Sequence, residues 1–235
     1  MLKWTREAAE LFMTAAEKTE FYPKTAAILA KKLAGARTVC DAGCGIGTLS
    51  LELAAYFESV TAADKDPQAM AFLRRTLIEK EIRNVVCREE DLIRAEPEEQ
   101  YDAMVFCYFG RTSEILHIAK RQCRGTVCII KKDYRFHRFS PGLPVSDETT
   151  DDCTAILARL GIPFEREDCE FECGQPLRSA AEAVRFFALY DRSGAEMTET
   201  EAEQRLERTD DPVFPLYLPM KKKVGMFFLR TEDLP

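Results

Sequence analysis

Residues 41–47 combine one carboxylate with three glycines at alternate positions, in the order Asp-Ala-Gly-Cys-Gly-Ile-Gly. Glycines at a strand-to-helix turn leave backbone N–H groups uncovered, so that a ligand can approach the main chain closely. Asp41 would repel a pyrophosphate, and Thr48 replaces the third glycine of the dinucleotide-binding pattern G-x-G-x-x-G. The turn therefore favours a ligand that carries an ammonium or a sulfonium group.

Two more carboxylates stand at the ends of predicted strands. Asp64 ends the segment 59–64, and Asp91 follows the segment 85–89 beside Leu92. Ligands of a doubly wound sheet bind in the crevice at the carboxyl ends of its strands. A carboxylate there can accept hydrogen bonds from both hydroxyls of a ribose, and one beside an apolar residue suits an adenine. Together with the glycine turn, these strand ends predict a site for a nucleoside with a cationic tail.

These motifs resemble those of the class I S-adenosylmethionine-dependent methyltransferases, whose first motif reads D/E-x-G-x-G-x-G. The resemblance covers about residues 35–130. It implies S-adenosylmethionine as the cofactor, with S-adenosylhomocysteine as the product. Carried over residue by residue, it places Asp41, Gly43, Cys44, Gly45 and Gly47 around the methionine part, Asp64 at the ribose, Lys65 against the adenine, and Asp91 and Leu92 at the base edge.

The elements that must position these residues alternate at short intervals, which argues for an α/β fold with one doubly wound, mostly parallel sheet. We predict strands at 38–41, 59–64, 85–89, 103–109, 126–131, 164–171 and 222–230. We predict helices at 3–18, 24–34, 47–57, 67–80, 112–120, 147–160, 180–190 and 198–208. The resemblance adds seven strands with the last one antiparallel, helices on both faces, and a Rossmann-like methyltransferase fold.

We expect residues 1–235 to form a single domain, with enough length for a sizeable core. Within it, residues 1–34 are expected to form a helical lid and residues 35–173 the cofactor-binding core. Residues 174–215 are expected to form a helical insert, and residues 216–235 contain the C-terminal strand.

The segment 131–138 follows the fifth predicted strand, at the end of the sheet where an acceptor would lie. It holds four Lys or Arg residues, two aromatic residues and one of the two histidines of the chain. We predict that His137 acts as general base, because an imidazole titrates near pH ~6.5. An exposed loop histidine without a catalytic role is the alternative. Arg135 and Arg138 are candidates to bind an anionic acceptor, and Tyr22 is a further candidate to contact the substrate.

Composition disfavours several classes of protein. The net charge of −7, from 33 Lys and Arg against 40 Asp and Glu, argues against a dedicated nucleic-acid binder. No apolar run approaches the ~18 residues of a membrane span, and acidic residues interrupt the N-terminal segment where a secretory signal would be apolar. The nine cysteines form no C-x-x-C pair. We therefore expect a cytoplasmic protein with buried free thiols and no metal site.

The sequence thus predicts an S-adenosylmethionine-dependent methyltransferase that acts on a small-molecule acceptor. Two alternatives stay open, namely an RNA or protein methyltransferase and an S-adenosylmethionine-binding protein without catalysis. Residues 106–110, Phe-Cys-Tyr-Phe-Gly, lack the N/D-P-P-Y/F motif of many nucleic-acid amino-methyltransferases. Methyl transfer from a sulfonium is an in-line displacement in which positioning supplies most of the rate. The acceptor, the accepting atom and the oligomeric state stay open.

Overall fold

The computed structural model describes residues 4–95, 100–135, 148–190 and 196–235. The chain divides into two compact units. The first, here called the sheet unit, comprises residues 22–133, 148–169 and 223–235. The second, here called the appended unit, comprises residues 1–21, 134–147 and 170–222. The expectation of a single domain with a helical lid stays a prediction.

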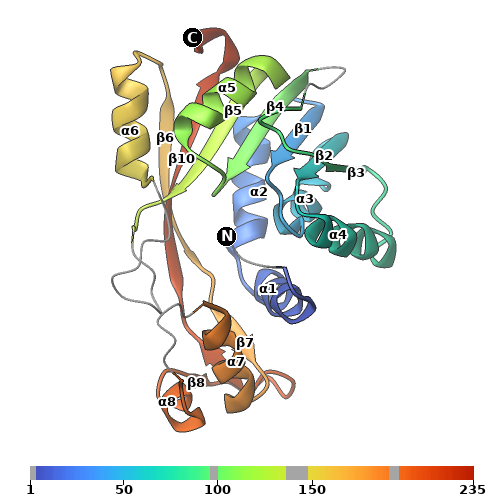
Figure 1. The fold of residues 1–235 in the computed structure, drawn as a ribbon, viewed down its shortest axis with the longest axis vertical. Helices are drawn as coiled ribbons and strands as arrows, with labels where there is room; N and C mark the ends of the chain where they lie inside the picture. Colours follow the sequence, from blue (N-terminus) through green and yellow to red (C-terminus); the bar gives the residue numbers. More distant parts are fainter. Residues whose placement is uncertain (1–3, 96–99, 136–147, 191–195) are drawn as a thin grey trace. The chain divides into compact units, whose positions relative to one another are not determined.

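A seven-stranded sheet in the order β3-β2-β1-β4-β5-β10-β6 forms the centre of the sheet unit (Figure 1). Its strands are β1 (Thr38–Ala42), β2 (Ser59–Asp64), β3 (Val85–Glu89), β4 (Tyr101–Cys107), β5 (Cys123–Lys132), β6 (Glu165–Glu172) and β10 (Lys221–Arg230). Parallel pairs join β1 to β2, β2 to β3, β1 to β4 and β4 to β5, whereas β10 is antiparallel to β5. The predicted mostly parallel sheet with an antiparallel last strand is therefore confirmed.

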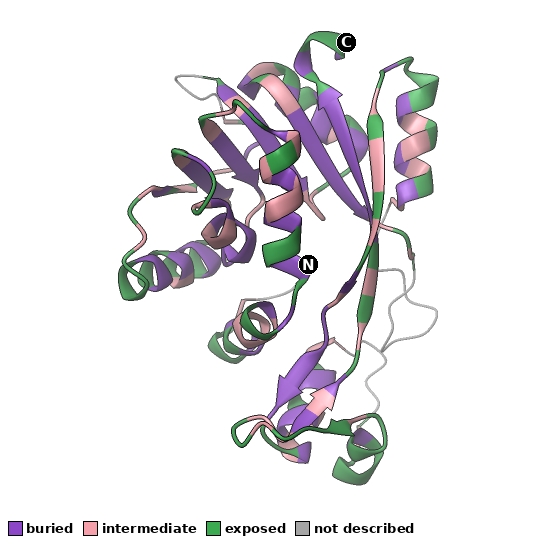
Figure 2. Ribbon diagram, turned by 180° about the vertical axis from the view of Figure 1, so that it is seen from behind, coloured by how far each residue is buried: buried purple, intermediate pink, exposed green. Residues whose placement is uncertain are grey.

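Helices cover both faces of this sheet. They are α2 (Phe21–Lys32), α3 (Thr48–Leu53), α4 (Pro67–Glu79), α5 (Thr112–Gln122) and α6 (Thr150–Arg159), and a short 3-10 turn (Thr231–Asp233) lies near the C-terminus. Two opposed views place α2 and α5 on opposite faces (Figure 1 and Figure 2). Helix α3 ends four residues before the predicted end at position 57. The side-chain amide of Asn84 donates to the carbonyls of Ala54 and Phe57 at 2.8 and 3.1 Å, which satisfies backbone groups beyond the helix end.

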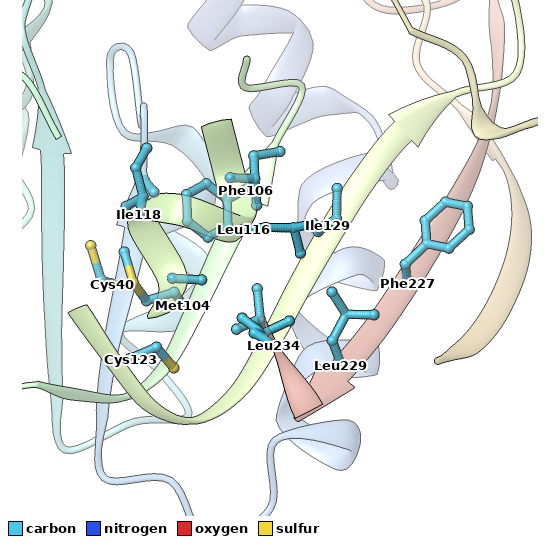
Figure 3. Close-up of a cluster of buried hydrophobic side chains, with 14 of the residues drawn as sticks. Cys40, Met104, Phe106, Leu116, Ile118, Cys123, Ile129, Phe227, Leu229 and Leu234 are labelled. Atoms are coloured by element: carbon cyan, nitrogen blue, oxygen red, sulfur yellow. The ribbon is translucent and has the colours of Figure 1, made fainter. Parts of the chain in front are cut away.

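The core of the sheet unit is apolar on both sides of β4 and β5. Residues 103–106 of β4 and 127–130 of β5 are completely buried, as the purple strands of Figure 2 show. One buried cluster joins β1, β4, β5, α5 and β10 (Figure 3), and it includes Cys40, Met104, Phe106, Leu116, Ile118, Cys123, Ile129, Phe227, Leu229 and Leu234. Burial of this cluster fixes the central strands, so their carboxyl ends form a rigid edge. All nine cysteines lie in the described part of the chain and are free thiols.

The appended unit contains strands that the sequence analysis missed. Its helices are α1 (Arg6–Lys18), α7 (Ala180–Tyr190) and α8 (Glu199–Glu203), and its strands are β7 (Gln175–Leu177), β8 (Glu207–Arg208) and β9 (Leu216–Leu218). The strands form a small antiparallel sheet in the order β7-β9-β8. The helix predicted at 198–208 ends at Glu203, because residues 207–208 pair with β9 instead. Within the described residues, no helix is long and apolar enough to span a bilayer.

Candidate functional site

The carboxyl ends of the central parallel strands bring the predicted cofactor residues to one edge of the sheet. Asp41 and Ala42 of β1 are in register with Ala62 and Ala63 of β2, so the glycine turn begins beside the end of β2. Asp64 is the last residue of β2. On the other side of β1, β4 pairs in parallel and ends at residue 107. The turns that follow β1 and β4 are therefore neighbours at this edge.

All three glycines of the turn have left-handed backbone conformations. Their φ angles are +73° at Gly43, +56° at Gly45 and +78° at Gly47, values that L side chains rarely adopt. A Cβ atom at Gly47 would collide with the side chain of Leu73, and one at Gly43 would collide with Phe109. Two of the glycines are thus required by packing inside the protein as well as by conformation.

The N–H groups of the glycine turn are bonded within the protein. Those of Gly43 and Cys44 donate to the carbonyl of Ala63 at 2.8 and 3.1 Å. The N–H of Gly45 donates to Oδ2 of Asp64 at 2.8 Å. A pyrophosphate site needs such groups free to point at the anion. The expectation of uncovered N–H groups is therefore wrong at residues 43–45, whereas the bonding agrees with the sequence argument against a dinucleotide.

Asp41 lies inside the protein, behind the glycine turn. It is 1% exposed, and its carboxylate accepts a hydrogen bond of 2.6 Å from Oγ of Ser50 in α3. Burial raises the pKa of this carboxyl to about 6, the Ser50 hydrogen bond opposes the shift, and the charge of Asp64 adds to it. Sequence reasoning missed Ser50, whose only signal is a polar residue on the buried side of a short helix. Above this pKa the site contains a buried, ionised carboxylate.

Asp64 ties the end of β2 to the glycine turn. One oxygen accepts the Gly45 bond, and the other accepts a hydrogen bond of 2.9 Å from the N–H of Asp66. A carboxylate has about four lone-pair positions. Asp64 therefore retains acceptor capacity for two hydroxyl groups. The neighbouring Lys65 is exposed.

The predicted base-edge residues lie in a turn that α5 supports. Leu92 is 3% exposed, and Asp91 accepts a hydrogen bond of 3.2 Å from the N–H of Ile93. The buried side chain of Gln122 donates to the carbonyls of Leu92 and Ala95 at 2.9 and 2.8 Å. Sequence reasoning missed Gln122, because nothing local connects the end of α5 to this turn. Gln122 holds the turn in place without being part of any motif.

The environment of the Cys44 thiol disfavours the thiolate form that a nucleophile needs. Burial raises its pKa well above the ordinary value, and the charges of Asp41 and Asp64 raise it further. The thiol therefore stays protonated. Among the described residues, no group of three or more His, Cys, Asp or Glu side chains could hold a metal ion.

The predicted acceptor residues are only partly described. Arg135 is exposed and belongs to the appended unit. Tyr22 lies in α2 and is 8% exposed. His137 and Arg138 lie outside the described residues. The roles of all four stay predictions.

Gly45→Val is expected to abolish the binding of S-adenosylhomocysteine, because a branched side chain would fill the space that the ligand needs. The φ of +56° adds a backbone cost of at least about 1–2 kcal/mol. Gly161→Val is the matched control, since Gly161 has a φ of +67° and a Cβ atom there would meet nothing within 4 Å. Thermal unfolding should show similar losses in both variants, and calorimetric titration should show lost binding only in Gly45→Val. Equal affinities in the two variants would contradict the assignment.

Residues 22–107 match the family model of the methyltransferase small domain. A putative methyltransferase from Bacillus halodurans C-125 has a TM-score of 0.57 at 13% identity, over 88% of this chain and 99% of that chain. Precorrin 8w decarboxylase from Methanobacterium thermoautotrophicum has a TM-score of 0.54 at 18% identity, over 88% of this chain and 89% of that chain. Magnesium protoporphyrin IX methyltransferase from Synechocystis PCC 6803 has a TM-score of 0.53 at 14% identity, over 97% of this chain and 88% of that chain.

No curated protein sequence matches the chain. At identities this low, the solved structures show a shared fold, and the family model adds the match over residues 22–107. That match contains the glycine turn and Asp64, and the fold has the strand order and the antiparallel last strand described above. Residues 22–107 thus resemble the methyltransferase small domain, and the chain shares its fold with these solved structures.

Proposed function

We propose that this protein transfers a methyl group from S-adenosylmethionine to a small-molecule acceptor. One observation carries the proposal. Asp64 bonds the glycine turn through one oxygen and keeps acceptor capacity for a ribose, at the edge of the sheet where the β1 turn also lies. A purely structural carboxylate would need neither the glycine turn beside it nor the supported turn at Asp91.

The residues present fit this cofactor. Gly45 is half-buried with a left-handed backbone, and the buried charge of Asp41 suits a cationic methionine part. Asp64 would accept the ribose hydroxyls, Lys65 would lie against the adenine, and the turn at residues 91–92 would contact the base edge. When bound, S-adenosylmethionine supplies an electrophilic methyl group. The protein's own contribution is to orient the two reactants and to exclude water.

Two observations support a small-molecule acceptor. The net charge of −7 disfavours a polyanionic acceptor such as RNA. Two of the structural neighbours are named for precorrin and for magnesium protoporphyrin IX. We further propose that the protein is cytoplasmic, since nine free cysteines suit a reducing compartment. Residues 22, 135, 137 and 138 remain the candidates for the acceptor side.

The purified full chain is expected to bind S-adenosylhomocysteine in a calorimetric titration and to bind NAD at least a hundredfold more weakly. Incubation with methyl-labelled S-adenosylmethionine and cell extract should then transfer label to the low-molecular-weight fraction. Tighter binding of NAD would contradict the cofactor assignment. Label in the RNA or protein fraction would favour a macromolecular acceptor, and binding without any transfer would favour a non-catalytic role.

A further inference from the structure

The turn between β4 and α5 has an unusual backbone conformation. Strand β4 ends at Cys107, two residues before the predicted end at position 109. Tyr108 has a φ of +58°, and its N–H donates to the carbonyl of Ile130 in β5 at 3.0 Å. A bulky side chain rarely adopts this conformation, which persists only where neighbouring contacts enforce it. The turn is therefore held in place by its surroundings.

A buried ion pair supplies part of this support. Nζ of Lys131 donates to the carbonyls of Gly110 and Phe109 at 2.7 and 3.4 Å. It also lies 3.4 Å from Oε2 of Glu148, and the two side chains are 4% and 13% exposed. The same carboxylate oxygen accepts hydrogen bonds of 2.7 and 2.6 Å from the N–H and the hydroxyl of Thr112. The pair thus joins the end of β5 to both ends of the turn.

The turn places the ring of Phe109 against the glycine turn. This ring is half-buried and lies 5.6 Å from the ring of Phe106, measured between centroids. A Cβ atom at Gly43 would collide with Cδ2 of Phe109, so the ring packs directly on the first glycine. That glycine belongs to the part of the site assigned to the methionine end of the cofactor. Phe109 therefore lies at this end rather than at the adenine end near Asp91.

We propose that the ring of Phe109 contacts the sulfur end of the cofactor and favours the sulfonium of S-adenosylmethionine over the thioether of S-adenosylhomocysteine. The proposal rests on the proposed function, because it takes the glycine turn as the site of the methionine part. An aromatic ring attracts a cation through its quadrupole, more strongly where water is excluded. Cofactor and product differ at this sulfur by one methyl group and one positive charge. A ring with this preference helps the product to leave after transfer.

Glu148 is a positioning residue in this arrangement. Lys131 holds the turn but, by itself, would place a positive charge near the sulfonium. The carboxylate of Glu148 neutralises that charge at 3.4 Å. Glu148→Gln should therefore weaken the binding of S-adenosylmethionine more than the binding of S-adenosylhomocysteine.

Calorimetric titrations of the full chain with both ligands test the proposal through the ratio of the two affinities. Phe109→Leu keeps an apolar side chain and is expected to lower the affinity for S-adenosylmethionine about five- to tenfold. The affinity for S-adenosylhomocysteine should fall less than about twofold, and Phe109→Tyr should keep the wild-type ratio. Phe164→Leu is the matched control, since Phe164 packs against the same buried cluster with its ring 5.7 Å from that of Phe227.

Equal losses for both ligands in Phe109→Leu would overturn the proposal, because the ring would then be only an apolar wall. If Phe109→Leu does not fold, Glu148→Gln decides. A lower ratio of the affinity for S-adenosylmethionine to that for S-adenosylhomocysteine would support the proposal, and an unchanged ratio would contradict it. A wild-type protein that binds neither ligand would instead refute the proposed function itself.

Discussion

Asp41→Asn is expected to stabilise the protein by about 3 kcal/mol at pH 8, although it removes a buried charged group that accepts a hydrogen bond. The carboxyl is 1% exposed, and burial raises its pKa from 3.8 to about 6 despite the hydrogen bond from Ser50. Asparagine has the same shape, can still accept from Ser50, and carries no charge to desolvate. Urea unfolding of the wild type and the variant measures the difference.

The pH dependence of this gain has a defined sign. The pKa in the folded state lies above that in the unfolded state, so the folded protein binds more protons between pH 3.8 and about 6. The contribution of Asp41 to stability therefore falls as the pH rises through this window, and the full penalty is present above it. At pH 5 the variant should show only about half of the gain measured at pH 8.

The same substitution is expected to weaken the binding of S-adenosylmethionine about tenfold at pH 8. A buried negative charge at the methionine end of the proposed site attracts a cationic ligand, and the effective dielectric constant there is low. Wild-type affinity should also fall below about pH 6, where Asp41 takes up a proton. A variant that is both less stable and unchanged in affinity would show that Asp41 is only a structural acceptor.

Asp102→Asn is the control for Asp41→Asn, because its expected effect on stability has the opposite sign. Burial alone would raise the pKa of Asp102, but hydrogen bonds from the N–H groups of Thr38 and Arg37 and from Arg124 outweigh it and lower the pKa. These contacts stabilise the ionised form, so the variant should lose stability above the unfolded pKa. Asp102 lies at the start of β4, away from the carboxyl ends of the strands. Its variant should keep cofactor affinity.

Asp64→Ala is expected to weaken the binding of S-adenosylhomocysteine by about ten- to a hundredfold, equivalent to roughly 1–3 kcal/mol. The change leaves the N–H groups of Gly45 and Asp66 without their acceptor and removes the proposed partner of the ribose hydroxyls. Because S-adenosylmethionine has the same ribose, its binding should weaken by the same factor. Calorimetric titration of both ligands measures this.

Asp66→Ala is the matched control for Asp64→Ala. Asp66 caps α4, where its carboxylate accepts hydrogen bonds from the N–H groups of Gln68 and Ala69 at 2.9 and 3.2 Å. Loss of this cap should cost about 1 kcal/mol of stability without a change in affinity. The ribose assignment fails if the two variants bind S-adenosylhomocysteine equally well.

The sheet and the glycine turn could be predicted from the sequence because their signals are local. The strands at 59–64 and 85–89 coincide with the predicted bounds. The first is a buried parallel strand, which reads as a short apolar run between turns. The second is an edge strand in which only Val85 is buried, and its Val-Val-Cys run gave the signal. Alternate glycines mark a turn with left-handed backbone whatever surrounds it. Parallel topology then brings the strand ends to one edge, so the residues of the proposed cofactor site could be named before their positions were known.

The state and the partners of these residues depend on contacts between distant parts of the chain. Ser50 against Asp41, Phe109 against Gly43 and the Lys131–Glu148 pair have no sequence pattern, because each contact exists only once the strands and helices pack. The small antiparallel sheet of the appended unit was missed for a related reason. Its strands have two or three residues, too few for a periodic signal, and pairing partners far along the chain decide their conformation. The sequence determined the kind of site and its motifs, and tertiary packing decided which carboxylate is buried and which ring lies beside the glycine turn.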